Sequence, residues 1–170
     1  AESSSILIPK VSSERRDYIP LGMVEPDTFC SDLVFLIPNA TLYHFGILQS
    51  QFHNAWMRRV AGRLKSDYRY SGGMVYNNFI WPDLSGPQGE ARHQAIESAA
   101  QAVLDARTQY PDSTIAEMYD PDNDFLFPAL TSAHRTLDAA VESAYGVSFD
   151  GDEQQILSHI FRVETIGQSL

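Results

Sequence analysis

The sequence predicts an α+β chain, with a small β-rich domain of mixed or antiparallel strands and one main helix, followed by an all-α helical domain. Residues 1–82 contain short β-prone runs separated by Pro and Gly, whereas residues 83–170 contain longer, periodic and alanine-rich segments. The charge changes at the same place, because residues 1–82 carry 8 Lys+Arg and 7 Asp+Glu and residues 83–170 carry 4 and 15. We therefore predict two domains, residues 1–82 and residues 83–170.

The predicted strands of the first domain are short runs rich in branched and aromatic residues. They are SILIPKV, YIPLGMV, DLVFLIP and YHFGIL, which begin at residues 5, 18, 32 and 43. Two more strands, over residues 65–71 and 74–79, are predicted to pair across Gly72-Gly73, because a Gly-Gly pair suits a tight hairpin turn.

The main helix of the first domain is predicted directly after Ser50, which suits an N-cap. Phe52, Trp56 and Met57 are spaced to form one apolar face, and Gly62 follows the helix as a C′ glycine would.

The second domain is predicted to contain four helices. Two are long: one covers residues 88–107 and ends before Tyr110-Pro111, and the other covers residues 127–145 and ends at Gly146. Two are shorter, one capped by Ser113 and one capped by Asp150 that runs from residue 152 to about residue 163.

Catalytic and metal-binding motifs are absent from the sequence. It contains no Walker loop and no His-Glu-x-x-His, and NNFIWP at residues 77–82 lacks the Pro-Pro of an adenine-gripping turn. Asp120, Asp122 and Asp124 match the start of an EF-hand loop, but Phe125 stands where that loop needs glycine, so a turn with helix-capping residues is the better interpretation. We therefore predict no catalytic site, metal or cofactor in this segment.

The histidines beside apolar residues and the single cysteine indicate structural roles rather than catalysis or metal binding. His44, His53 and His134 stand beside apolar residues at strand or helix spacing, so we expect hydrogen-bonded core residues rather than ligands. The single cysteine, Cys30, allows neither an internal disulfide nor a Cys-based zinc site and fits a reducing cytoplasm.

The overall charge and hydropathy restrict the partners of the chain. A formal net charge of −10 disfavours strong DNA binding by the chain alone, and only residues 1–82, with a net charge of +1, suit a polyanion. No apolar run approaches the roughly 20 residues needed to cross a bilayer, so a membrane partner is not expected. The chain begins with Ala and enters a strand-like run almost at once, which predicts a piece of a longer protein.

The segment GRLKSDYRYSGG, residues 62–73, is the strongest candidate for function. If it is a strand, Lys65, Asp67 and Arg69 project from one face; Leu64, Tyr68 and Tyr70 then point into the core. Lys donates to guanine O6 and N7, and a carboxylate accepts from cytosine N4, so Lys65 and Asp67 suit both edges of one G·C pair. Arg69 would contact a neighbouring base or a phosphate.

Other basic side chains of the first domain are candidates for positioning the protein on the DNA backbone: Arg15, Arg16, Arg58, Arg59 and Arg63. Each candidate has a simpler alternative. The alternating charges of residues 65–69 also suit an exposed amphipathic strand, and Arg15 and Arg16 could pair with neighbouring carboxylates. Pattern alone favours these structural interpretations.

Ordered segments of the chain resemble a known family. In residues 1–82 the segments SSERRDYIPLG, FGILQSQFHNAWMRRVAGRLKSDYRYS and VYNNFIWP resemble the target-recognition domain of MmeI-like type IIL restriction–modification enzymes and their methyltransferase relatives. The segments VLDARTQYPDSTIAEMYDP and FPALTSAHRTLDAAVESAYG resemble the helical C-terminal domain of that family. The resemblance covers most of the chain in the right order.

The resemblance implies a role in DNA sequence recognition. The parent protein would be a cytoplasmic, prokaryotic adenine-N6 DNA methyltransferase that uses S-adenosylmethionine, with or without a nuclease that needs Mg²⁺. Its partners would be double-stranded DNA and a methyltransferase domain outside this chain. The paired specificity positions of the family fall on Lys65 and Asp67, where Lys with Asp implies guanine and Glu with Arg implies cytosine, and Arg69 matches a further position. The resemblance therefore favours base reading; the alternative is a protein-interaction module that docks through the acidic helical half.

Overall fold

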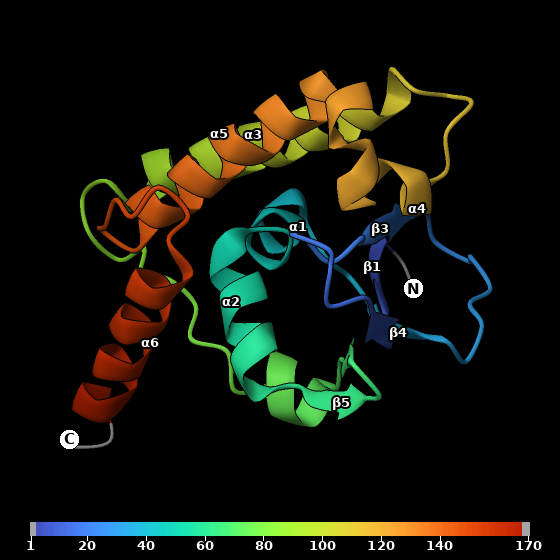
Figure 1. Ribbon diagram of the computed structural model, residues 1–170. Coiled ribbons are helices and arrows are strands. Elements are labelled where there is room, and N and C mark those ends of the chain that lie inside the picture. Colours follow the sequence, from blue (N-terminus) through green and yellow to red (C-terminus); the bar gives the residue numbers. More distant parts are fainter. Residues whose placement is uncertain (1–2, 168–170) are drawn as a thin grey trace.

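The computed structural model describes residues 3–167 and confirms the α+β class (Figure 1). The strands are β1 (Ser5–Pro9), β2 (Val11–Ser12), β3 (Gly22–Val24), β4 (Val34–Ile37), β5 (Gly62–Leu64) and β6 (Asp67–Arg69). The helices of the first half are α1 (Leu42–Leu48), α2 (Gln51–Val60) and the π-helical turn η1 (Gly72–Tyr76). Those of the second half are α3 (Gly89–Thr108), α4 (Ile115–Met118), the 3₁₀ helix η2 (Pro121–Leu126), α5 (Pro128–Ala144) and α6 (Glu153–Gly167).

The strands form two small antiparallel sheets that meet at Lys10. One sheet has the order β3-β1-β4 and the other β2-β6-β5. Lys10 lies between β1 and β2; its N–H donates to the carbonyl of Leu33 (2.9 Å) and its carbonyl accepts from the N–H of Tyr70 (2.8 Å). One residue therefore ties the β5–β6 hairpin to the edge of the first sheet.

The predicted main helix is confirmed as α2. The Ser50 side chain accepts from the His53 N–H at its start, and Phe52, Trp56 and Met57 are all buried. Its end differs in detail, because Ala61 is an extended C-cap and Gly62 is already the first residue of β5.

The segment YHFGIL was predicted as a strand, and this is wrong, because it forms most of α1. Thr41 caps the helix in a reciprocal capping box with His44, a local signal for helix. Gly46 lies so close to α3 and α5 that a Cβ there would be 2.7 Å from Cγ2 of Ile96 and 3.3 Å from Leu137. The tertiary environment between two helices therefore overrides the β propensity of the segment.

The predicted hairpin across Gly72-Gly73 is also wrong. The hairpin is β5–β6, with Leu64 opposite Asp67 and Lys65-Ser66 as its turn, and the residues after Gly72 form η1 instead of a strand. Leu64 is 50% exposed rather than buried, while Tyr68 and Tyr70 are buried as predicted.

Glycine is needed at position 72 because the backbone of η1 packs closely against the Phe35 side chain there. A Cβ on Gly72 would lie 2.7 Å from two ring carbons of Phe35 on β4, whereas one on Gly73 would have nothing within 4 Å. The glycine lets η1 approach the first sheet rather than turning a hairpin.

The helical half matches the prediction closely. The helices predicted over residues 88–107 and 127–145 are α3 and α5, and Gly146 follows α5 with φ +74. Two helix caps differ from the prediction by one or two residues. Thr114 caps α4 in place of Ser113. Asp152, in place of Asp150, accepts the N–H of Gln155 (2.9 Å) at the start of α6. Asp120 caps η2, so the acidic segment is the predicted interhelical turn.

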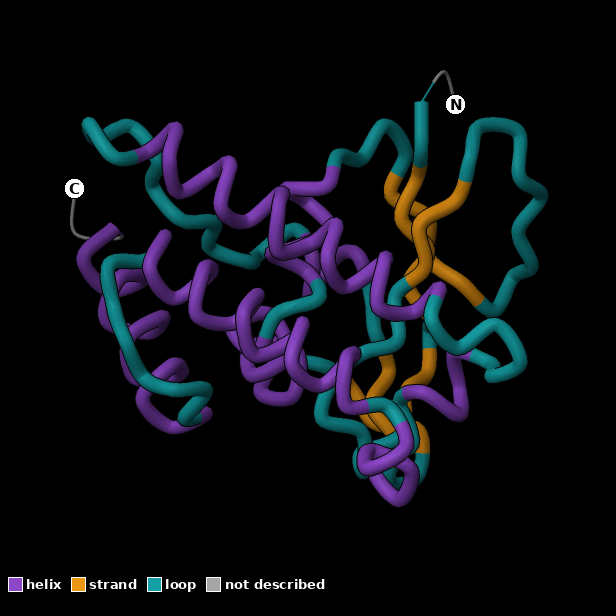
Figure 2. The backbone as a smooth tube through the Cα atoms, turned by 90° about the horizontal axis from the view of Figure 1, so that it is seen from above, coloured by secondary structure: helices purple, strands orange, loops and turns teal. Residues whose placement is uncertain are grey.

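The two halves of the chain share a core. α3 and α5 lie side by side across α1, and α6 packs against α2 (Figure 1). Seen from above, the strands gather on one side of the molecule and most helices on the other (Figure 2). Buried apolar residues of both halves belong to one continuous cluster. Within residues 3–167, no helix has both the length and the apolar character needed to cross a membrane.

Alanine substitutions of the two adjacent glycines should separate packing from turn formation. We expect Gly72→Ala to lower the free energy of unfolding by about 1–3 kcal/mol, because the new methyl group overpacks against Phe35. The Phe35 ring is half-buried and lies beside Tyr70 and Tyr76, with ring centroids 6.1 Å and 6.2 Å away. Gly73→Ala is the matched control and should change stability by less than about 0.5 kcal/mol. Urea unfolding of both variants checks this; equal effects would contradict the packing explanation.

Candidate nucleic-acid interface

The β5–β6 hairpin presents the predicted base-reading residues, but not in the way that the sequence predicted. Lys65 lies in the turn rather than in a strand, with φ 60, and its side chain is exposed. Asp67 and Arg69 begin and end β6 and share one face of it, because Tyr68 between them is buried on the other. Lys65 therefore stands next to this face at the tip of the hairpin.

The base of this hairpin is held on both sides. β6 is the central strand of its sheet, where Arg69 pairs with Gly62 on β5 and with Val11 on β2. Tyr70 follows β6 directly. Its hydroxyl group and the buried Nε2 atom of His53 on α2 form a hydrogen bond of 2.8 Å. The tip therefore projects from a well-anchored strand.

The predicted backbone-positioning arginines fall into two groups. Three are paired with carboxylates: Arg15 with Asp122 (2.8 Å), Arg58 with Glu153 (3.3 Å) and Arg63 with Glu14 (3.2 Å). In the part of the chain that the structure describes, the other two, Arg16 and Arg59, have no side-chain partner, and the same holds for Lys65 and Arg69.

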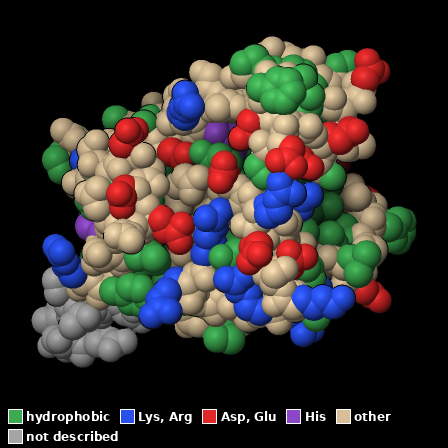
Figure 3. All heavy atoms as spheres, viewed as in Figure 1, with side chains coloured by type: hydrophobic (Ala, Val, Ile, Leu, Met, Phe, Trp, Pro, Cys, Tyr) green, Lys and Arg blue, Asp and Glu red, His purple; other side chains and the backbone are tan. Residues whose placement is uncertain are grey.

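Charge is unevenly spread over the face seen in Figure 3. Lys and Arg side chains gather in its lower half, over α2 and β5, whereas Asp and Glu side chains dominate the upper half. The difference in charge between the two halves of the sequence is thus also a difference in space.

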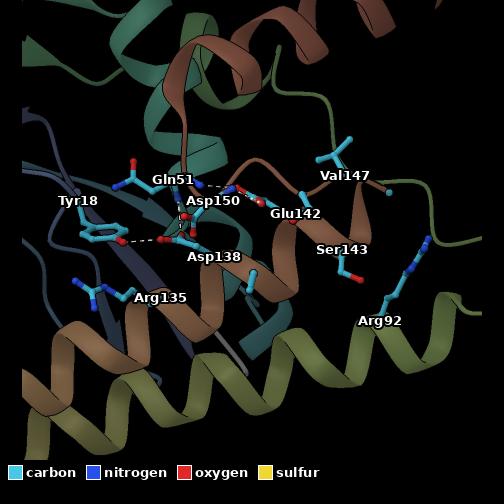
Figure 4. Close-up of a pocket in the computed structure, with 13 residues that line it drawn as sticks. Tyr18, Gln51, Arg92, Arg135, Asp138, Glu142, Ser143, Val147 and Asp150 are labelled. Carbon is cyan, nitrogen blue, oxygen red and sulfur yellow. Dashed lines mark hydrogen bonds between the residues drawn. The ribbon is translucent and has the colours of Figure 1, made fainter.

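The start of α2 is fixed by a carboxylate from the helical half. Asp138 on α5 accepts the N–H of Gln51 through Oδ1 (2.9 Å) and the O–H of Tyr18 through Oδ2 (2.5 Å), as Figure 4 shows. Burial raises the pKa of the Asp138 carboxyl from 3.8 to about 6, against the opposing effect of these two hydrogen bonds. Burial, with the nearby Asp138, also raises the pKa of Tyr18.

One turn further along α5, Glu142 shapes the loop that leads into α6. Its carboxylate accepts the N–H groups of Phe149 (2.7 Å), Asp150 (3.2 Å) and Gly151 (2.8 Å). α6 in turn carries Glu153, the partner of Arg58. Side chains of α5 therefore hold both the start of α2 and the loop that leads into α6.

The open cavity of about 850 Å³ in Figure 4 lies over this region and is lined by Asp138, Glu142, Arg92 and Arg135, among other residues. The two carboxylates already accept hydrogen bonds from the protein. Among the described residues, no group of three or more His, Cys, Asp or Glu side chains is arranged to hold a metal ion.

His53 and His134 are hydrogen-bonded core residues, as predicted, whereas His44 is not part of the core. His53 and His134 are fully buried and bond to Tyr70 (2.8 Å) and Tyr119 (2.7 Å), and burial lowers the pKa of both to about 3. His44 is half-buried and completes the capping box of α1.

A buried cation that the sequence pattern did not indicate joins the two halves. Arg107 on α3 donates to the carbonyl of Leu21 (2.7 Å), to Oε1 of Gln49 (3.1 Å) and to Oη of Tyr119 (2.7 Å). An arginine in the last turn of a helix is ordinarily a surface residue, so no sequence signal indicated this contact.

Comparison with known proteins agrees with this architecture. Residues 1–83 match the model of the MmeI target recognition domain, and residues 88–166 match that of the MmeI C-terminal domain. The chain belongs to the MmeI family. The resemblance seen in the sequence is thus confirmed, and it favours target recognition over a protein-interaction module.

Two relatives place the chain within larger proteins. DNA methyltransferase A of Bacillus subtilis (strain 168) is 44% identical over 153 residues, which are 89% of this chain and 17% of that protein. A solved structure of the type IIL restriction–modification enzyme MmeI in complex with DNA is similar over 100% of this chain and 22% of its own, with 40% identity and a TM-score of 0.89. The chain therefore corresponds to about a fifth of either relative.

The contact between α5 and α2 should make the stability of this MmeI-family chain depend on pH through Asp138. Because the folded pKa of about 6 lies above the ordinary value, ionisation destabilises the fold as pH rises from about 4 to 7. Asp138→Asn removes this ionisation, so its free energy of unfolding relative to wild type should rise by roughly 2–3 kcal/mol over that range. His53 and His134, present in both proteins, cancel in the difference.

Urea unfolding of wild type and Asp138→Asn at four pH values between 4 and 7 measures this difference. A difference that stays constant across the range would mean that burial does not govern the ionisation of Asp138.

Proposed function

We propose that this chain is the DNA-recognition part of a larger, site-specific DNA methyltransferase and that it reads base edges in the major groove of duplex DNA. The observation that carries this proposal is an exposed lysine beside a strand carboxylate, at the tip of an anchored hairpin in a target recognition domain. A two-stranded ribbon fits the major groove, whose width is about 12 Å.

The chemistry of the tip suits one G·C pair. The ammonium group of Lys65 is a donor for guanine O6 and N7, and the carboxylate of Asp67 is an acceptor for cytosine N4. Both side chains are free of protein partners in the described part of the chain, so neither has to break a bond to meet a base. Arg69, exposed at the other end of β6, would contact the next base pair or a phosphate.

Phosphate contacts would come from the basic lower half of the face in Figure 3. Arg16 and Arg59 are available directly, whereas Arg15 and Arg58 would first exchange a carboxylate for a phosphate. Exchange costs little for the exposed Arg15–Asp122 pair, because such pairs contribute about 0–1 kcal/mol, whereas the Arg58 side chain is 21% exposed and also donates to the carbonyl of Arg16 (2.6 Å). The acidic helical half would face away from DNA and pack against the rest of the parent protein.

Methyl transfer would take place outside this chain. The parent methyltransferase would bind S-adenosylmethionine in another domain, flip the target adenine out of the duplex and methylate its N6. A nuclease that uses Mg²⁺, if the parent has one, would lie in another domain as well. Such a protein would act on DNA in the cytoplasm of a prokaryotic cell.

Exchanging the charges of the tip should switch the recognised base pair. We expect Lys65→Glu with Asp67→Arg, made in the full-length protein, to change one position of the methylated motif from G·C to C·G, because donor and acceptor change places. Sequencing of methylated motifs in DNA exposed to the enzyme measures this.

The matched control exchanges two charges at the same spacing on α3, Glu90→Arg with Arg92→Glu, and should leave the motif unchanged. An unchanged motif with full activity in the Lys65/Asp67 variant would contradict base reading by the hairpin. Unchanged DNA binding after neutralising Lys65 and Arg69 would support the protein-interaction alternative.

A further inference from the structure

The guanidinium group of Arg63, on β5, is bonded within the hairpin rather than free in solvent. Its Nη1 donates to the carbonyl oxygen of Ser66 (2.5 Å) and to Oε2 of Glu14 (3.2 Å). Its Nη2 donates to Oη of Tyr68 (3.2 Å), and the guanidinium carbon lies 3.9 Å from the centroid of the Tyr68 ring. Four separate contacts therefore fix one side chain.

The segment that these contacts hold is the turn that carries Lys65. Lys65 has φ 60, in the left-handed region, which non-glycine residues rarely adopt without support from their surroundings. The Ser66 carbonyl, bonded to Arg63, belongs to the same two-residue turn. Arg63 lies two residues before Lys65 and bonds the residue directly after it, so the turn is held from both sides of Lys65.

We propose that Arg63 is a positioning residue for base recognition, which rests on the function proposed above. With Glu14 and Tyr68 it forms a brace that holds the Lys65-Ser66 turn in its strained conformation, so that the ammonium group of Lys65 meets guanine at a fixed distance and angle. Arg63 is then not one of the residues that contact phosphate.

The composition of the brace supports this role. Glu14 compensates the charge of Arg63, which weakens its attraction for phosphate. Tyr68 is 9% exposed and pairs directly with Arg63 across the two strands, so it gives the guanidinium a fixed surface for stacking. Glu14 follows β2, and the brace therefore ties all three strands of the sheet to the turn.

Arginine is required for this geometry because its planar fork bonds several acceptors at once and stacks on a ring, which the ammonium group of lysine does not do. Arg63→Lys therefore removes the brace but keeps the charge. A phosphate contact, in contrast, tolerates this substitution, since lysine also binds phosphate as a point charge.

The test is binding of full-length Arg63→Lys to two duplexes, one with the recognised G·C pair and one with C·G at that position, over a series of salt concentrations. We expect discrimination between the duplexes to fall about tenfold, with binding to the C·G duplex and the salt dependence unchanged. Hydrogen exchange of residues 64–67 should become about tenfold faster. Arg135, exposed on α5 and outside the proposed DNA-contacting residues, is the matched control, and Arg135→Lys should leave discrimination unchanged.

Two results would overturn the brace. One is discrimination within twofold of wild type in Arg63→Lys. The other is equal weakening of both duplexes in Arg63→Gln, with the slope of log K against log salt reduced by about 0.9, which is the signature of one lost phosphate contact. If Arg63→Lys fails to fold, the same binding and hydrogen-exchange measurements are made on Tyr68→Phe. This variant removes the hydroxyl acceptor of Arg63 and keeps the ring on which the guanidinium stacks.

The Lys65→Glu/Asp67→Arg exchange, measured in parallel, separates the brace from the function on which it rests. If that exchange leaves the recognised base unchanged, base reading by the hairpin is wrong whatever Arg63→Lys does. If it switches the base and Arg63→Lys keeps full discrimination, only the brace is wrong.

Discussion

The hydrogen bond between Asp138 and the first N–H of α2 is the contact on which the geometry of the recognition half depends. α2 leads directly into β5, so its direction sets where the hairpin projects. An anionic carboxylate at a helix N-terminus is favourable, because it meets free N–H groups and the positive end of the helix dipole. Burial acts the other way and dominates the balance, since the pKa of Asp138 is raised rather than lowered. The contact therefore fixes position at some cost in stability.

A second buried polar contact has the same character. Arg107 is 8% exposed, and within the described part of the chain its hydrogen-bond partners are neutral oxygens of Leu21, Gln49 and Tyr119. A buried charge held by neutral acceptors stabilises less than it would beside a carboxylate, but its directional bonds allow only one arrangement of the groups around it. Leu21 and Gln49 belong to the first half and Arg107 to the second, so this arrangement also fixes one half relative to the other. The helical half thus serves as a scaffold for the hairpin, whatever further contacts it makes.

Local signals in the sequence predicted local structure well, and long-range packing explains the failures. Ser50 and Gly146 marked helix ends correctly, because a cap depends on a few adjacent residues. The hairpin predicted at Gly72 is wrong, because the sequence does not distinguish a glycine that makes room for a distant ring, here that of Phe35, from a glycine in a turn. Lys65 gave no turn signal at all, because its left-handed conformation depends on surrounding contacts rather than on its own residue type. The candidate residues could be named from alternation and family resemblance, but the contacts through which Asp138 and Arg63 support them could not.

A chain with a net charge of −10 is suited to recognising DNA only if local charge counts for more than total charge. At physiological salt, charges more than about 8 Å apart in solvent are largely screened, so the acidic upper half of the face in Figure 3 has little effect at the hairpin tip. Carboxylates also pair with three arginines of the first half, Arg15, Arg58 and Arg63, which reduces the attraction of this half for phosphate whatever the DNA sequence. Among the described residues, Lys65 has no side-chain partner and lies at the tip of the hairpin. Weak general attraction together with a rigid donor suits a module whose task is to discriminate between bases, because non-specific binding to phosphate competes with every specific site.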